Sequence, residues 1–499
     1  MKEAAQIDRI VVLGAGSAGL MSAMAIRRAF PSLAVTIVSS SNIPIIGVGE
    51  STTVLLPPFL HQSLGLNFQE FFQNVQTSWK LGVKFVWGDP KDSHFNYPFD
   101  SCMSSKPAHL AKMPTYHCMH DWSAASSCWE LMDKGLSPCF HDGKGNISLS
   151  DAFGYHIENR SFVAYLQKNA VSLGIEFVDG EFSTVKADQD GCIESIALTD
   201  GRTIEGDLFV DCSGFQSKLL AEQMKSPFVS YEDSLFCDRA VVGSWQRTDE
   251  AIQPYTTAET MNNGWCWRID FPDHITRGYV FSSAFCSDDQ AIQEFRAVNP
   301  KIGDDLRVIQ FSSGRYEKFW MKNVVAIGNS CGFVEPLEAT ALHLVVEQVR
   351  LLCRILSETD LRVVPALRDV ANRQFALLWD EVRDFLAIHY RFNRKSDSAF
   401  WQHCRTNTNL GGATDFVNLY QEAGPSSLCA TLLPSGYMFG YDGFMALLIG
   451  QRVPTKFSWQ PGDEDQKRWS YHQDQIRNRA KNALSMQQAL QHVLSKKPN

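Results

Sequence analysis

The sequence predicts an α/β fold with an inserted antiparallel sheet and a helical C-terminal region, and three observations lead to this class. A glycine-rich turn follows a β-branched run near the N-terminus, and a helical pattern follows the turn. Short alternating strands with two Asp-Gly turns come later, between residues 175 and 214. Another apolar run with a glycine returns at residues 323–330. Because 499 residues exceed what one core usually supports, we expect two or three closely packed units.

The first element reads RIVVLGAGSAGLMSAMAIRRA, which is a strand, a tight turn and a helix in that order. Gly14, Gly16 and Gly19 permit the turn, a close approach of backbone to a pyrophosphate, and close packing of helix on strand. This GxGxxG pattern in this setting predicts dinucleotide binding. A second strand, AVTIVSS, ends where a ribose-binding carboxylate is usual. Ser39 stands there instead, and its hydroxyl can bond a ribose only without the charge.

The middle of the chain contains a meander with hairpin signals at Asp190-Gly191 and Asp200-Gly201. The run DLFVDCSG ends this meander, and the late strand NVVAIGNS is expected to return to the same sheet. We therefore expect four regions along the chain. They are a dinucleotide-binding region at 1–225 with a substrate-side insertion at 90–150, a strand-rich insertion at 226–320, a return of the dinucleotide-binding region at 321–360, and a helical region at 361–499.

The run FVEPLEATA, residues 333–341, places Glu338 at the predicted entrance to an amphipathic helix. An apolar stripe at steps of three and four follows it, formed by Leu342, Val345, Val346, Val349 and Leu352. Unpaired N–H groups near Thr340 and Ala341 would offer partial positive charge to a small anion, and Glu338 beside them could take a proton. The plainer alternative is an ordinary helix with an acidic residue near its start.

Another tract, SWKLGVKFVW, reads as one strand whose odd positions, from Trp79 to Trp87, face a core. Lys80 and Lys84 share the other face, and the pattern alone predicts that both are solvated.

Composition excludes several classes of protein. Apolar residues make up 44% and charged residues 20%, which is typical of a globular chain, and the net charge of −9 comes without a basic block that would favour nucleic acid. No uncharged stretch is long enough to span a bilayer and no signal peptide is present, so we expect no membrane association and a cytoplasmic location. Thirteen cysteines are scattered singly, as in reduced proteins. We expect no metal, because the nearest ligand cluster matches no usual spacing; its members are His109, His117, Cys118, His120 and Cys128.

The order of these elements resembles the flavin-binding fold of the hydroxybenzoate-hydroxylase class. The resemblance implies FAD, and because the chain has no second GxGxxG for a nicotinamide nucleotide, reduced flavin would come from a separate NAD(P)H-dependent reductase. Asn329 stands where many members have aspartate, and it can still bond a ribityl hydroxyl. The implied FAD-binding residues are Gly14, Gly16, Ser17, Ala18, Gly19, Ser39, Gly49, Glu50, Ser51, Gly328 and Asn329.

Within that class, four tracts together resemble the flavin-dependent halogenases of the tryptophan-halogenase type. They are the GAGSAG turn with IIGVGEST (residues 45–52), SWKLGVKF (78–85), the WxWxI of residues 265–269, and FVEPLEATA. The resemblance covers residues 10 to about 355. It implies halogenation of an electron-rich aromatic ring by hypohalous acid, formed from halide with reduced FAD and oxygen.

The resemblance also implies a role for each matched residue. Lys80 projects into the substrate chamber, where it holds hypohalous acid by hydrogen bonding or carries the halogen as a haloamine. Glu338 acts near it on the oxidant and the ring proton. The backbone amides of Thr340 and Ala341 bind halide, which is chloride, bromide or iodide. Ala339 and Ala341 replace the usual serine and glycine, which leaves room for a shift in halide preference toward bromide or iodide.

Trp265 and Trp267 lie on one face of a predicted strand, and the resemblance makes them a wall between substrate and flavin. Packing under the flavin region is their plainer role. Asp270 stands where the family's usual proline follows the isoleucine, so the match to the family is looser in the local turn although both tryptophans are kept.

Substrate and alternative functions stay open at this point. Aromatic residues in the substrate-side regions suit an electron-rich ring such as an indole or a phenol; they are His94, Phe95, Tyr97, Phe99, Trp122, Trp129, Trp401, Tyr437, Phe439, Tyr441 and Phe444. The alternatives are a flavin monooxygenase that transfers oxygen directly and a non-catalytic flavin-binding protein. Whether the chain forms a homo-oligomer is also open.

Overall fold

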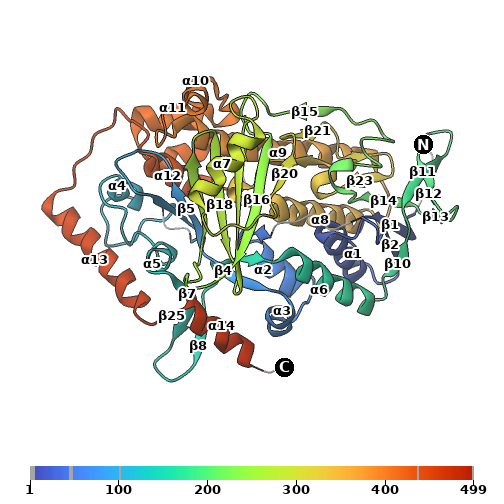
Figure 1. Cartoon of the computed structure of the whole chain (residues 1–499), viewed down its shortest axis with the longest axis horizontal. Coiled ribbons are helices and arrows are strands. Elements are labelled where there is room, and N and C mark those ends of the chain that lie inside the picture. Colours follow the sequence, from blue (N-terminus) through green and yellow to red (C-terminus); the bar gives the residue numbers. More distant parts are fainter. Residues whose placement is uncertain (1–5, 44–48, 101–102, 435, 437, 497–499) are drawn as a thin grey trace.

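The computed structural model describes residues 6–43, 49–100, 103–434, 436 and 438–496 (Figure 1). Two large sheets organise the chain, one mainly parallel and one mainly antiparallel, and the helices that follow residue 398, drawn in orange and red, lie mainly on the left-hand side of the view. This arrangement confirms the predicted mixed α/β class with an antiparallel sheet and a helical C-terminal region.

The parallel sheet carries the glycine-rich turn. Its strands, in spatial order, are β10 (Glu176–Asp179), β2 (Ala34–Ser39), β1 (Arg9–Leu13), β14 (Leu208–Asp211), β23 (Val324–Ala326) and β22 (Trp320–Met321). All neighbours are parallel except β22, which is antiparallel to β23. Since β23 pairs with β14, the late strand does return to the first sheet, as predicted.

Two layers cover this sheet because its strands are apolar on both faces. Helices α1 (Ser17–Ala29), α6 (Asn159–Ser172) and α8 (Ala341–Glu358) form one layer, in which α1 contacts both others. The other layer is the antiparallel sheet of β11 (Phe182–Ala187), β12 (Ile193–Leu198) and β13 (Thr203–Glu205). Both Asp-Gly turns join its strands, and Gly191 and Gly201 have φ of 75° and 90°. The hairpin predictions are therefore confirmed.

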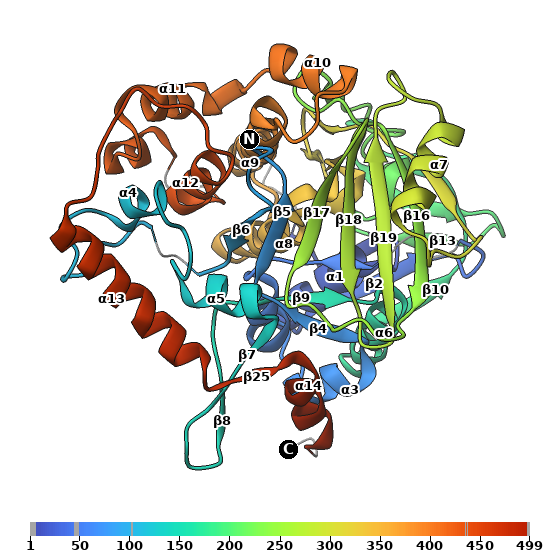
Figure 2. The ribbon, with the colours of Figure 1, turned by 60° about the vertical axis from the view of Figure 1, so that its left-hand side comes forward.

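The second large sheet joins segments that are distant in sequence (Figure 2). Its strands, in spatial order, are β20 (Arg307–Gln310), β16 (Arg239–Gln246), β19 (His274–Phe281), β18 (Gly264–Asp270), β17 (Thr256–Met261), β5 (Gly82–Val86) and β6 (Phe95–Pro98). Strands β5 and β17 pair in parallel, and all other neighbours are antiparallel.

The predicted strand SWKLGVKFVW is two strands, which corrects the sequence interpretation. Strand β4 (Thr77–Lys80) pairs with β9 (Gly154–Ile157), whereas β5 belongs to the seven-stranded sheet. Leu81 lies at the break, and its N–H donates to the carbonyl of Pro254 at 2.7 Å. The odd positions are buried as predicted. The break allows Lys80 to turn inward, so the prediction of a solvated lysine there is wrong.

Helices dominate after residue 361, as predicted. They are α9 (Pro365–Phe392), α10 (Ala399–Asn407), α11 (Thr414–Ala423), α12 (Gly440–Gly450), α13 (Asp463–Ala480) and α14 (Met486–Ser495). Between the last two, β25 (Ala483–Ser485) pairs with β7 (Leu136–His141). Among the described residues, no helix combines the length and apolar character that crossing a membrane requires.

Candidate functional site

The glycine-rich turn between β1 and α1 has the geometry of a pyrophosphate cradle. A Cβ on Gly14 would lie 2.3 Å from the carbonyl oxygen of Cys212, and one on Gly19 would lie 2.0 Å from the carbonyl oxygen of Gly14. These two glycines are required by the protein's own packing. A Cβ on Gly16 would meet nothing within 4 Å, so this backbone stays open to a ligand. Gly16 also precedes α1 without a side-chain cap, which leaves helix N–H groups for an anion.

Other predicted FAD residues gather at the carboxyl ends of the same strands. Ser39 ends β2, and a Cβ on Gly328 would lie 3.0 Å from the Cβ of Ala18 in α1. The N–H of Gly328 donates to Gln348 at 2.9 Å. Asn329 and Ala341 line one small hollow together with Gly328, Phe333, Val334, Leu344 and Trp379. The chemistry of this donor set fits a flavin nucleotide, which the turn before α1 and the residues near the start of α8 would hold.

The IIGVGEST tract is described only from Gly49 onward, and residues 45–48 lie outside the described ranges. Gly49 has φ of 98°, and the adjacent Glu50 starts β3 (Glu50–Ser51). Burial raises the pKa of the Glu50 carboxyl to about 7. The Ser51 hydroxyl lies 2.7 Å from that of Thr256, which joins this tract to the seven-stranded sheet.

The predicted helix after FVEPLEATA is α8, and its apolar stripe is buried as expected. Glu338 ends a short 3-10 turn, η4 (Pro336–Glu338), and Ala339 follows in the left-handed region with φ of 58°. Thr340 is then the N-cap residue of α8, without a side-chain cap. The Glu338 carboxyl contacts His389 at 2.8 Å instead of capping α8, and α8 has no side-chain cap on its first amides.

Lys80 is fully buried, and the structure gives its Nζ no hydrogen-bond partner among the described residues. The ammonium lies 4.9 Å from the centroid of the Phe99 ring. Burial lowers the pKa of Lys80 to about 7, and only the charge of Glu338 opposes this shift. An uncompensated buried amine is costly, so its presence points to chemistry and not to stability.

Glu338 lies in the same buried region, although 258 positions separate it from Lys80. The carboxyl is 3% exposed, and burial raises its pKa, while His389 and Lys80 lower it. Oε1 lies 2.8 Å from Nε2 of His389. The amine and the carboxyl therefore influence each other's ionisation inside one low-dielectric space.

Sequence reasoning missed His389, which lies on α9 and is fully buried. The sequence feature that could have indicated this residue is a histidine on the apolar face of a long helical pattern. Tyr97 was considered only as an aromatic contact, yet burial raises the pKa of its hydroxyl and the charge of Glu338 raises it further. Both side chains belong to the space around Lys80 and Glu338.

The two tryptophans of WxWxI share one face of β18, with ring centroids 6.1 Å apart. Trp265 Nε1 donates to Glu335 at 3.1 Å. Trp267 fills the space above Gly278 on β19, where a Cβ would lie 1.9 Å from its ring. Both indoles are nearly inaccessible, so each side chain packs tightly.

Asp270, which stands at the family's usual proline position, is held by two arginines. Strand β18 runs through it, and its buried carboxylate accepts from Arg247 at 2.8 Å and from Arg268 at 3.0 Å.

The candidate substrate aromatics fall into two groups. Phe99 and Tyr97 lie beside Lys80 and Glu338, and Phe439 stacks on Phe385 with centroids 3.7 Å apart, one helical turn from His389. The others are core or peripheral; Trp401, Phe444, Tyr441, Trp129 and Phe95 are buried, and Trp122 and His94 pack near α5 (Ser127–Lys134). Tyr437 lies outside the described residues.

The histidines considered for metal instead pack on aromatic rings. His117 stacks on Trp469 with centroids 4.9 Å apart, and His120 bonds the carbonyl of Trp459 at 2.7 Å. Within the described ranges, no three His, Cys, Asp or Glu side chains converge as metal ligands do, and every cysteine is free.

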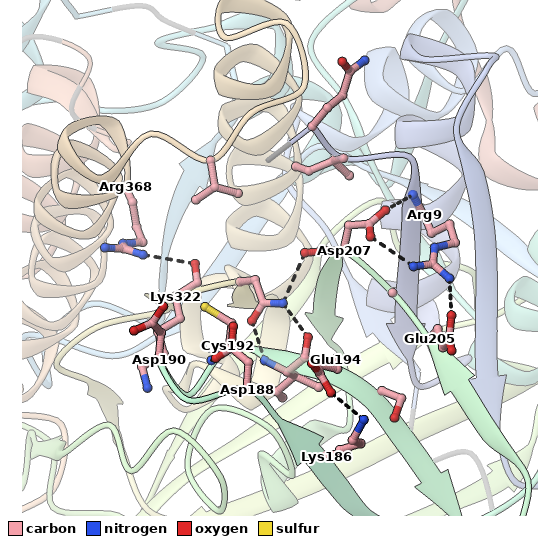
Figure 3. Close-up of a pocket in the computed structure, with 17 residues that line it drawn as sticks. Arg9, Lys186, Asp188, Asp190, Cys192, Glu194, Glu205, Asp207, Lys322 and Arg368 are labelled. Carbon is pink, nitrogen blue, oxygen red and sulfur yellow. Dashed lines mark hydrogen bonds and ion pairs between the residues drawn. The ribbon is translucent and has the colours of Figure 1, made fainter. Parts of the chain in front are cut away.

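A cavity of about 810 Å³ lies at the end of the parallel sheet opposite to the predicted FAD-binding residues (Figure 3). It is lined by the amino ends of β1, β14 and β23, and its charged side chains largely pair with one another, as Arg9 does with Glu205 and Asp207. Ligands of such folds bind at the carboxyl ends of the strands, so this cavity is not the dinucleotide site.

Comparison with known proteins gives consistent results. A family model described as tryptophan halogenase matches residues 9–463. Tryptophan 7-halogenase KtzQ of Kutzneria sp. is 32% identical over 462 residues, which cover 87% of this chain and 85% of that protein. The structure of MibH, a lanthipeptide tryptophan 5-halogenase, is similar with a TM-score of 0.90 and 34% identity, covering 99% of this chain and 95% of that one. The structure of BrvH, a flavin-dependent halogenase from Brevundimonas sp. BAL3, has a TM-score of 0.86 and 27% identity. The match covers 98% of this chain and 99% of BrvH.

Proposed function

Because this chain belongs to the tryptophan halogenase family and is thus a flavin-dependent halogenase, we propose that Lys80 and Glu338 direct hypohalous acid onto an electron-rich aromatic ring. The observation that carries this proposal is the buried, unpartnered amine of Lys80 coupled to the buried carboxyl of Glu338. Both groups are expensive to bury, and the Lys80 amine has no hydrogen-bond or ion-pair partner among the described residues that would make its burial structural.

Bound reduced FAD, held by the turn after β1 and the entrance of α8, supplies the activated oxygen that turns halide into hypohalous acid. The amides of Thr340 and Ala341 would hold the halide at the start of α8, where helix N–H groups favour an anion. Trp265 and Trp267 would keep the aromatic substrate away from the flavin, since both buried indoles lie on the same face of β18 with centroids 6.1 Å apart.

Lys80 aims the oxidant. Its pKa of about 7 means that both the ammonium and the free amine are populated near neutral pH. The ammonium donates a hydrogen bond and then its proton to the hypohalous oxygen, which leaves as water when the oxygen–halogen bond breaks and the carbon–halogen bond forms, and Lys80 is left as the free amine. The free amine could instead carry the halogen as a haloamine.

Glu338 completes the substitution. After the halogen adds, the ring carbon still holds its hydrogen, and that C–H bond must break so that its electron pair restores aromaticity. A carboxylate in a dry chamber stabilises the cationic ring and accepts this proton. The raised pKa of Glu338 makes it a better base than an exposed glutamate.

The substrate that we propose carries an indole, because the relatives are described as tryptophan halogenases, and one of them as a lanthipeptide tryptophan 5-halogenase. Phe99, Tyr97 and Phe439 are the aromatic side chains placed to hold such a ring. Phenols are the second choice. A separate NAD(P)H-dependent reductase would supply the reduced flavin.

The test is turnover of a panel of indoles and phenols with a flavin reductase, NADH, FAD and oxygen. Chloride, bromide or iodide is supplied separately, and products are read by mass. We expect a product heavier by one halogen minus one hydrogen, formed only when halide is present. A hydroxylated product formed without halide would establish the monooxygenase alternative, and no product with any substrate would support a non-catalytic role.

A further inference from the structure

His389 is the polar partner of Glu338, and its surroundings restrict where its protons lie. The imidazole is fully buried on the last turn of α9. Rings of Phe85, Phe385 and Trp87 surround it, with centroids 5.0, 5.5 and 6.2 Å away. Trp87 Nε1 also donates to the backbone carbonyl of His389 at 2.9 Å, which fixes this turn against β5.

The two imidazole nitrogens have different partners. Nδ1 lies 3.1 Å from the carbonyl oxygen of Phe385, and a carbonyl can only accept, so Nδ1 carries a proton. Nε2 lies 2.8 Å from Oε1 of Glu338. If neither atom of this second pair held a proton, two lone pairs would face each other at that distance. One proton therefore lies between Nε2 and Oε1.

We propose that His389 is a positioning residue that shares one proton with Glu338, so that this dyad, and not Glu338 alone, receives the proton that the aromatic ring loses. The inference rests on the proposed function. The shared proton holds Oε1 toward α9, which leaves Oε2 as the oxygen that can face the ring. When the ring C–H bond breaks, its proton goes to Oε2 and the shared proton moves fully onto Nε2, so the positive charge resides on the imidazolium.

The other ionisable groups around the dyad are few. Lys80 on β4 and Tyr97 on β6 both interact with Glu338. Behind them, His156 on β9 interacts with Lys80, and Asp442 on α12 interacts with Tyr97. The rings that pack on the imidazole are apolar. Lys80 is thus the main charge that competes with the dyad, and an imidazolium next to Glu338 leaves the carboxylate anionic without requiring the Lys80 ammonium.

The first test uses the protein alone, so it does not depend on any substrate. In protein labelled with 15N at histidine, we expect Nδ1 of His389 to show a protonated shift, because it faces the carbonyl of Phe385. We expect Nε2 to show a fully or partly protonated shift that changes to an unprotonated one in Glu338→Gln. His156 serves as the internal control, because burial lowers its pKa to about 3 and it should stay neutral and unchanged. An unprotonated Nδ1, or the same Nε2 shift in both proteins, would overturn the proposal.

The second test compares His389→Gln with His61→Gln. His61 is the matched control because its Nδ1 also faces a carbonyl, that of Leu66 at 2.9 Å, but its Nε2 faces the neutral hydroxyl of Tyr155 at 2.9 Å. Using bromide and a ring-deuterated indole that the wild type brominates, we expect His389→Gln to slow bromination roughly 100-fold, the lower range for acid–base catalysis. Flavin oxidation should continue at the wild-type rate, and a primary isotope effect absent from the wild type should emerge.

If the substitutions acted only on structure, the bromination rates of His389→Gln and His61→Gln would fall by similar factors without an isotope effect. That result would overturn the positioning role. If the wild type brominates no indole, the proposed function fails, while the labelling experiment still decides the dyad.

Discussion

At the scale of single residues, burial of Lys80 has a consequence for stability that can be measured. The amine has an ordinary pKa of 10.5 in the unfolded chain and about 7 in the folded one. Between these values the unfolded state binds more protons than the folded state. The free energy of unfolding of the wild type therefore rises as the pH increases from about 7 to 10.5. Below pH 7, the burial of Lys80 costs the most.

We therefore predict that Lys80→Met is more stable than the wild type at pH 7 and that this advantage shrinks by about 2 kcal/mol between pH 7 and 9. Free energies of unfolding from denaturant titrations at both pH values measure the change. Lys84→Met is the control, since Lys84 is partly exposed and donates to the Tyr255 hydroxyl at 3.1 Å. Parallel behaviour of the two variants would mean that Lys80 is not buried as a neutral amine.

How far the sequence predicted the site depends on the kind of residue. The glycine turn and the stripe of α8 follow from local rules, so they were predictable from spacing alone. The inward turn of Lys80 was not, because period-2 alternation places it with Lys84, and only the break at Leu81 separates the two. His389 could not be paired with Glu338 from spacing either, since 51 positions and a change of element lie between them.

At the scale of elements, the β1–α1 turn separates glycines needed for folding from one needed for binding. Gly16→Ala should change the free energy of unfolding by no more than about 1 kcal/mol, since its φ of −74° suits alanine and no atom is near. The methyl group would enter the space that we propose for the pyrophosphate, so FAD affinity should fall about tenfold or more, or at least 1.4 kcal/mol.

Gly19→Ala is the matched change in the same turn. Its Cβ would collide with the backbone of Gly14, so it should destabilise the protein by about 3 kcal/mol. Thermal unfolding and titration of FAD by fluorescence separate the two effects. Normal FAD binding by Gly16→Ala would place the cofactor elsewhere.

Elements formed by residues close together in the sequence were predictable, whereas pairings between distant segments were not. Hairpins closed by Asp190-Gly191 and Asp200-Gly201 form within a few residues, and the sequence predicted them. The seven-stranded sheet pairs β5 with β17 across some 170 positions, and no local pattern indicates that partner. Side-chain alternation predicts that a strand exists, but not which strand it pairs with.

At the scale of the whole molecule, helix α13 packs on the substrate-side segment at residues 90–150 and lies away from the parallel sheet. Trp469 on α13 stacks on His117, and its Nε1 donates to the carbonyl of Asp121 at 3.1 Å. Gln473 on the same helix donates to the Asp121 carboxylate at 2.7 Å. Figure 2 shows α13 along the edge of the molecule, near α5 and away from β2.

We predict that Trp469→Ala destabilises the protein by about 3 kcal/mol, as expected for a buried tryptophan, yet leaves FAD affinity unchanged. Tyr471→Ala on the same helix is the control, because Tyr471 is 57% exposed and should cost little. Unfolding and FAD titration measure both quantities, and a large loss of FAD affinity in Trp469→Ala would show that the two regions are coupled.

The most direct measurement of the central claim compares bromination of an indole by the wild type, Lys80→Ala and Lys84→Ala, with flavin oxidation followed in the same reactions. The account predicts that Lys80→Ala yields no brominated indole while it consumes reduced flavin at the wild-type rate, and that Lys84→Ala still brominates. Equal bromination by Lys80→Ala and the wild type would contradict it.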